Sequence, residues 1–445
     1  MNFLLLTSKN ILKKPEDICL YMCILIIPCL ILGPFLPDLF VVIITLFFIY
    51  QINKKKINIF KNNYVIFFIL FYILIISSSL LSSYWVGSLK SSLTFIRFLF
   101  FSLAFYWIIS SNEKLFFENL QKVIFFVISL LFVDSIIQFI FHQNLFGMKV
   151  VDTGEAYVRV TSFFGDEQIL GGFIARCSPI FLYVFLNNKL NRKFIYIFLL
   201  VINIIVLLSG ERTALGLILI FNTLFFFKIF DKKKDIKILL FFIIIFFSVL
   251  TLNKSVYDRI LKYTIHQITE NEVPYLKIGE KLDRLSLNNI KKPKYVFSKE
   301  HTAHYVKAFN IFLDNPYFGV GPKNFRNYCK KEKYQLTNEF FNTVRKDYGC
   351  STHPHNLIAQ FLAETGIFGA FFYLIALIYV SINLFKQFRI QKDESLKVFV
   401  LYLGVLINIF PFFPSGNFFN NWLSVILHFI IGLLIYEKTK YSKLY

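Results

Sequence analysis

The chain has 445 residues and a formal net charge of +21; 56% of its residues are hydrophobic and only 17% are charged. Soluble domains carry about a quarter charged residues, and here the apolar excess is gathered in blocks of about 17 to 25 residues, each long enough to cross a bilayer. The composition therefore predicts an all-α integral membrane protein and excludes a soluble nucleic-acid-binding protein. Its 58 Phe and 18 Gly argue against the alternating strands of a membrane β-barrel.

The apolar blocks predict about twelve transmembrane helices. They cover residues 17–36, 37–50, 64–83, 91–110, 121–141, 168–186, 194–209, 213–230, 236–252, 355–385, 396–411 and 419–436. Clusters of Lys and Arg follow every second block, for example at residues 54–56, 232–234 and 438–443. Because short basic loops stay in the cytoplasm, both termini are expected there. The connections at residues 142–167 and 210–212 are then expected on the outer side.

Residues 253–354 are the one connection long enough for a soluble subdomain. The chain thus divides into a membrane region of about nine spans at residues 1–252, this outward loop, and a membrane region of about three spans at 355–445. The loop carries 18 Lys and Arg against 10 Asp and Glu. Such a basic surface either keeps the loop soluble or binds an anionic ligand. Within it, residues 301–313 are expected to form an amphipathic helix, followed by a turn at residues 319–322.

Histidines stand where the outward loop passes into the tenth block. His353 and His355 directly precede Asn356. An ordinary histidine has a pKa near 6.5 and can take a proton from a reacting group at the outer side of the membrane. The alternative is that these polar residues only cap the helix at the membrane interface.

A tight turn joins the eighth span to the one before it and reads SGERTALG, with Glu211 and Arg212 at its centre. Arg212 must lie at the outer end of two spans. It either extends to the interface to keep its charge in water or binds a phosphate group with two parallel hydrogen bonds. A neighbouring carboxylate such as Glu211 is not needed for the first role, and it either holds Arg212 or contacts a substrate.

The segment RVTSFFGDEQILGGFIAR brings Arg159, Asp166 and Glu167 to the start of the sixth span. The two acidic residues could hold a metal, accept a proton or fix a nearby arginine, and the sequence leaves these three possibilities open. Gly171 and Gly172 lie just inside the span, where small residues allow two helices to approach closely.

Two charged residues, Arg97 and Asp134, lie inside apolar blocks. A charge at that depth is costly and marks a functional site by default. Both are expected in the outer halves of their helices. Arg97 either contributes to the same pocket as the other outward residues or forms an ion pair with Asp134.

Cys329 and Cys350 both lie in the outward loop, and a location outside the cytoplasm is oxidising. They predict a disulfide that closes a loop of about twenty residues. Such a bridge would hold residues 321–326 close to His355.

Four segments together resemble one family. HNLIAQFLAETGIFG at residues 355–369, SGERTALG at 209–216, NPYFGVGPKNFR at 315–326 and RVTSFFGDEQILGGFIAR at 159–176 are similar to the O-antigen ligase and O-antigen polymerase family. The likeness extends over most of the chain from about Asp134 onward. The CSTHPHN segment at residues 350–356 departs from the simplest ligase pattern.

The resemblance implies a glycosyltransferase of the bacterial inner membrane that takes a glycan from an undecaprenyl-diphosphate carrier at the periplasmic face. The acceptor is a hydroxyl of lipid A core for a ligase, which we favour, or of a second carrier-linked glycan for a polymerase. No nucleotide sugar or cofactor is implied, and no metal is required. Arg212 matches the family arginine that binds the diphosphate, and His355 matches the proposed base. Arg159 and Glu364 match further substrate-binding positions, which we extend to Glu211, His353, Arg97 and Asn356.

The chain has no G-x-x-x-x-G-K-[ST] phosphate loop, so a reaction would draw its energy from an activated lipid donor or a gradient. A transporter of lipid-linked glycans is the rival interpretation, since it too would need a basic cavity. Transporters usually contain internal repeats with interrupted helices, and no repeat is evident here.

Overall fold

The computed structural model describes residues 15–55, 59, 62–152, 158–229, 257–262, 264–265, 298–336, 348–390 and 393–440. Its helices in the first half are α1 (Pro15–Leu32), α2 (Phe35–Lys55), α3 (Asn63–Leu80), α4 (Trp85–Phe95), α5 (Arg97–Ser111), α6 (Glu113–Phe141), α7 (Leu170–Asn187), α8 (Arg192–Ser209) and α9 (Arg212–Ile229). The second half adds α13 (Lys299–Asp314), α14 (Phe325–Tyr328), α15 (Leu357–Arg389), α16 (Asp393–Asn408) and α17 (Asn421–Thr439). Short single turns lie at η2 (Ser162–Phe164), η3 (Asp258–Lys262) and η5 (Glu332–Tyr334).

The expected membrane fold is confirmed. Within the described residues, 10 helical segments are long and apolar enough to cross a membrane, with α4 and α5 counted together as Trp85–Ser111. The 16-residue α16 lies on the eleventh expected block, and the ninth, residues 236–252, falls outside the described residues. The described chain departs from an all-helical fold at one short ladder, where β1 (Val151–Asp152) pairs antiparallel with β2 (Val158–Arg159).

Asparagine side chains begin many of these helices. The side chains of Asn62, Asn112, Asn191, Asn356 and Asn420 each accept a hydrogen bond from a backbone N–H in the first turn of α3, α6, α8, α15 and α17. Such a cap satisfies one of the N–H groups that a helix start leaves without a partner. The same contact fixes where each apolar segment starts.

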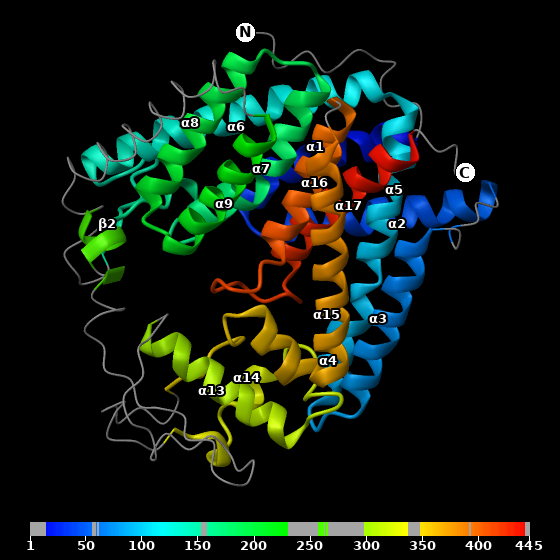
Figure 1. The fold of residues 1–445 in the computed structure, drawn as a ribbon, viewed down its shortest axis with the longest axis vertical. Helices are drawn as coiled ribbons and strands as arrows, with labels where there is room; N and C mark the ends of the chain where they lie inside the picture. The colour runs from blue at the N-terminus through cyan, green and yellow to red at the C-terminus, as the bar shows by residue number, and fades with distance from the viewer. Residues whose placement is uncertain are drawn as a thin grey trace.

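The molecule has two parts that α3 and α15 connect. In Figure 1, α15 and α3 run side by side along the molecule, with α13 and α14 gathered at one end of them and α6 to α9 toward the other end. The helix α17 packs against α5 and α16, and α16 packs against α7 and α15. The predicted amphipathic helix at residues 301–313 is confirmed as α13. It lies beside the start of α15.

Helix α15 is interrupted at Gly366, which has φ +66° and ψ −165°. The break frees the Ile367 N–H, which donates to the Pro316 carbonyl at 2.8 Å. The carbonyl of Glu364 accepts from Gly321 N–H at 2.8 Å. A Cβ at Gly366 would lie 2.2 Å from the Tyr317 carbonyl oxygen, so only glycine fits. Two motifs of the sequence, residues 315–322 and 363–369, are thus each other's backbone partners.

Candidate functional site

Four histidine rings gather where α13 meets the start of α15, and we call them the histidine cluster. His353 and His355 come from the loop before α15, whereas His301 and His304 come from α13. The ring of His355 is central, with centroids of His353, His304 and His301 at 4.1, 5.0 and 5.6 Å. Its backbone has φ +55°, a left-handed conformation that aims the side chain back toward α13.

The rings around His355 are held in place by their own hydrogen bonds. His304 Nδ1 lies 2.7 Å from the Gly349 carbonyl, and His353 Nε2 lies 3.0 Å from the Ser415 carbonyl. Because a carbonyl only accepts, both nitrogens carry the proton and donate. His301 Nδ1 lies 2.7 Å from Ser298 Oγ, the N-cap of α13. In the described part of the chain, no residue forms a hydrogen bond with the His355 ring, which leaves its nitrogens open to a ligand.

Burial keeps the histidine cluster neutral. Burial, followed by the neighbouring rings of His353, His304 and His301, lowers the pKa of His355 to about 3. Burial likewise lowers the pKa of His353 and of His301 to about 4. A neutral imidazole has an unprotonated nitrogen, so at physiological pH His355 is in the form that a general base requires, while the lowered pKa makes it a weaker base than an ordinary histidine.

Arg212 is the first residue of α9. Its Nη1 donates to Thr264 Oγ1 at 3.4 Å. Its positive charge also contributes to the lowered pKa of His301, after burial and after the charge of His304. Arg212 thus acts electrostatically on His301, whose ring lies 5.6 Å from the ring of His355. A cavity that holds Arg212, Arg159 and His355 together stays a prediction.

Glu211 binds the backbone of α7. Its two carboxylate oxygens accept hydrogen bonds from Gly171 N–H at 2.6 Å and from Gly172 N–H at 3.1 Å. Burial raises the pKa of Glu211 to about 7, although these two bonds and the charges of Arg159 and Arg176 lower it. A Cβ at Gly171 would lie 2.4 Å from Ser209 Oγ, so the glycine pair admits both the close packing and the carboxylate. We call this arrangement the Glu211 turn.

Arg159 lies at the end of β2 and faces the Glu211 turn. Its Nη1 donates to Gln168 Oε1. Its buried Nε has no hydrogen-bond partner among the described residues. The neighbouring acidic residues Asp166 and Glu167 are exposed. No three His, Cys, Asp or Glu side chains within the described ranges are arranged to hold a metal ion.

The predicted disulfide is confirmed. Cys329 and Cys350 are bonded, with their Cα atoms 5.5 Å apart, and the bridge joins the end of α14 to the loop that carries His353. This holds Arg326 of α14 near the histidine cluster, where its charge contributes to the lowered pKa of His353, chiefly after burial and the charge of His304. Arg326 has a buried Nε without a hydrogen-bond partner in the described chain. Sequence reasoning did not assign it, although it ends the motif at residues 315–326.

Comparison with known families decides the relationship. Residues 195–374 match the family model described as O-antigen ligase. This part of the chain is an O-antigen ligase family domain. The matched residues run from α8 to the middle of α15, and they include Arg212, Arg326 and all four rings of the histidine cluster. A search of curated proteins found no match to the chain.

Two further residues of the O-antigen ligase domain have structural contacts. Glu364 is fully buried, and its carboxylate accepts from Gln360 Nε2 at 2.8 Å and from Phe325 N–H at 3.1 Å. It therefore joins α15 to the start of α14. Asn356 caps α15 and donates from Nδ2 to the Pro411 carbonyl at 2.8 Å. Glu364 thus holds the helix that carries Arg326, and Asn356 holds the start of the helix that follows His355.

Arg97 lies outside the O-antigen ligase domain and pairs with a residue that the sequence did not suggest. Its guanidinium bonds Asp38 at 2.8 and 3.0 Å and Asn421 Oδ1 at 2.9 Å. The alternative of an ion pair with Asp134 is wrong, because Asp134 instead accepts from Leu145 N–H at 2.9 Å and from Ser162 Oγ. The physical reason is helix adjacency, since α5 packs against α2.

Proposed function

We propose that this chain is a glycosyltransferase of the bacterial inner membrane that uses a lipid-linked glycan. It transfers the glycan from undecaprenyl diphosphate to an acceptor hydroxyl at the periplasmic face. Lipid A core is the proposed acceptor, which makes the enzyme an O-antigen ligase, and a carrier-linked glycan would make it a polymerase. The basic clusters at residues 54–56 and 438–443 support the orientation, with both termini in the cytoplasm.

The observation that carries the proposal is the ring of His355, which forms no hydrogen bond with the described residues and lies among the other histidine rings. His301 and His353 contact this ring, and the charge of Arg212 acts on His301 while that of Arg326 acts on His353. A base and cations in one location suit a reaction in which a hydroxyl loses a proton and a diphosphate leaves.

The proposed step is a single displacement. A nitrogen of His355 takes the proton of the acceptor hydroxyl, and the acceptor oxygen forms a bond to the anomeric carbon of the donor sugar. The bond from that carbon to the carrier phosphate breaks, and its electron pair leaves with the diphosphate. Arg212 stabilises the negative charge that develops on the leaving oxygen. The configuration at the anomeric carbon inverts.

The test is transfer by the purified full-length protein with an undecaprenyl-diphosphate glycan as donor and EDTA present. Lipid A core and a second carrier-linked glycan are offered as separate acceptors. The variants are Arg212→Ala and His355→Asn, because asparagine tolerates the left-handed backbone at residue 355. The controls are Arg389→Ala and His142→Asn, which replace exposed residues of the same types, and His142 has the same left-handed backbone with φ +58°.

We expect both site variants to lose activity by about 10²-fold or more while the controls keep it. Product on lipid A core would identify a ligase, and a longer carrier-linked chain would identify a polymerase. Full activity of His355→Asn would refute its role as base, and loss of wild-type activity in EDTA alone would refute metal independence. Movement of the glycan across the bilayer without a new glycosidic bond would refute the enzyme proposal and support the transporter interpretation.

A further inference from the structure

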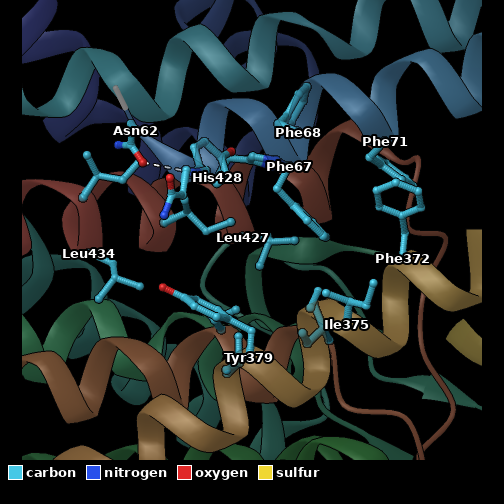
Figure 2. Close-up of a pocket in the computed structure, with 18 of the residues that line it drawn as sticks. Asn62, Phe67, Phe68, Phe71, Phe372, Ile375, Tyr379, Leu427, His428 and Leu434 are labelled. Atoms are coloured by element: carbon cyan, nitrogen blue, oxygen red, sulfur yellow. Dashed lines mark hydrogen bonds between the residues drawn. The ribbon is translucent and has the colours of Figure 1, made fainter. Parts of the chain in front are cut away.

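A cavity of about 800 Å³ lies between α3, α15, α16 and α17, away from the residues of the proposed reaction. Figure 2 shows its walls: Phe67, Phe68 and Phe71 of α3 lie opposite Phe372, Ile375 and Tyr379 of α15. Leu427, His428 and Leu434 of α17 also line the cavity. Almost all of these side chains are apolar. We call this cavity the α3–α15 groove.

Aromatic rings close the groove toward the histidine cluster. The ring of Phe361 lies 6.1 Å from that of Phe71 and 4.9 Å from that of Phe418. On the far side of this layer, Phe418 N–H donates to Gln360 Oε1 at 3.0 Å, in the polar network of Glu364. The groove is therefore separated from the proposed donor site by packed rings, and a molecule in one need not enter the other.

The opposite end of the groove is polar and carries one cation. Asn62, Thr439 and Lys438 line it, and Lys438 Nζ donates to the hydroxyl of Tyr402 at 3.0 Å. None of the described carboxylates forms an ion pair with Lys438. Lys440, on the same helix end, is instead paired with Glu113.

The groove is open on its lipid side. Tyr379 and Ile375 line it and are 53% and 37% exposed. Both belong to α15, one of the helices long and apolar enough to cross a membrane. Surface of this kind on a membrane helix meets lipid chains rather than water, so a chain can enter sideways between α15 and α3.

We propose that the α3–α15 groove binds an anionic phospholipid, with one acyl chain between the aromatic walls and the phosphate at Lys438. The occupant follows from charge complementarity: the wall is mostly apolar, and among the described residues that line it the one cation, Lys438, lies at its polar end. Basic residues at a membrane surface attract anionic lipid headgroups. The Lys438 end is the cytoplasmic end in the proposed orientation, so the lipid comes from the leaflet opposite the reaction.

The test uses purified, delipidated full-length protein titrated with phosphatidylglycerol or phosphatidylcholine, and native mass spectrometry counts the bound lipids. Lys438→Gln removes the cation, and Lys440→Gln is its matched control because it removes the same charge from the same helix end. Ala376→Trp fills the groove, whereas Ile378→Trp places the same ring outside the lining on the exposed face of α15.

We expect wild type to retain one phosphatidylglycerol in preference to phosphatidylcholine. Lys438→Gln should weaken that binding about fivefold, and Ala376→Trp should abolish it, while both controls bind like wild type. Equal retention of the two lipids, or unchanged binding by Ala376→Trp, would overturn the proposal. Displacement of phosphatidylglycerol by undecaprenyl diphosphate would also overturn it, because the groove would then hold the donor. None of these outcomes depends on glycan transfer.

Discussion

The histidine cluster and the Glu211 turn both place polar side chains at the end of a membrane helix, yet they use them in opposite ways. At the Glu211 turn, both carboxylate oxygens are taken by the N–H groups of Gly171 and Gly172. At the histidine cluster, backbone carbonyls fix His304 and His353, and the ring of His355 has no hydrogen bond from the described residues. The comparison separates residues that hold the framework from residues that face a ligand.

The largest expected effect sharpens that division within a single motif. Arg212→Lys keeps the positive charge next to Glu211 but replaces the planar fork of the guanidinium by a single ammonium group. If Arg212 binds the leaving diphosphate through two bonds, kcat/KM should fall by about 10²-fold. The measurement is steady-state transfer, with Arg389→Lys as the control.

An unchanged thermal midpoint of the Arg212→Lys variant would show that the loss is one of binding and not of folding. Activity within about threefold of wild type would place Arg212 with the framework residues, beside Glu211, and the comparison would fail at that position.

Removal of the disulfide should have the next largest effect. The bridge between Cys329 and Cys350 ties Arg326 to the loop of the histidine cluster. The double variant Cys329→Ser/Cys350→Ser should lose about 2–4 kcal/mol of stability. Hydrogen exchange should increase in residues 325–334 and 348–356 and stay unchanged in α5 and α17. Uniformly faster exchange throughout the protein would contradict a local tether.

A smaller effect is expected at the Glu211 turn. Gly171→Ala would place a Cβ 2.4 Å from Ser209 Oγ and 3.1 Å from Glu211 Oε1. Overpacking of this kind costs about 1–3 kcal/mol, so the thermal midpoint should fall. The folded fraction should transfer glycan at the wild-type rate. The control is Gly87→Ala, where a Cβ has no neighbour within 4 Å. A large loss of kcat with unchanged stability would mean that the Glu211 turn takes part in catalysis.

Much of the fold follows from the sequence because bilayer thickness imposes it. Apolar length located the spans, and an oxidising outward loop indicated the bridge of Cys329 to Cys350. The sequence singled out His355 and Arg212 because they are polar residues at the outer ends of membrane spans. The sequence does not contain helix adjacency, however. Arg97 therefore forms its ion pair with Asp38 and not with Asp134, because α2 and not α6 supplies the neighbouring carboxylate.

The parts of the site that escaped prediction are those that tertiary contacts create. His301 and His304 appear in sequence as ordinary residues of an amphipathic helix, and only the packing of α13 on α15 brings them to His355. Gly366 resembles a helix-packing glycine, but it breaks α15 so that the Ile367 N–H can reach Pro316. In both cases the feature forms only when two segments that lie far apart in the sequence come into contact.

The smallest expected effect is on the pH profile. An ordinary imidazole with a pKa near 6.5 would lose its neutral form about thirtyfold between pH 8 and pH 5. Burial lowers the pKa of His355 to about 3, so its base form should persist over that range. We expect kcat/KM to stay nearly level from pH 8 to pH 5. An acid limb at pH 6.5, lost in His355→Asn, would show that the ring meets water and that the cluster is not closed.

Stability should respond to pH where activity does not. The folded pKa of His353 and of His355 lies below the ordinary value, so the unfolded chain binds protons more readily once the pH falls below 6.5. The stability contributed by these neutral rings is therefore complete above pH 6.5 and is lost progressively as the pH falls toward 4. His353→Gln should flatten this dependence while it leaves the Glu211 turn intact, and thermal unfolding at pH 7.5 and pH 5 measures the difference. A slope that His353→Gln leaves unchanged would assign the acid sensitivity to groups outside the histidine cluster.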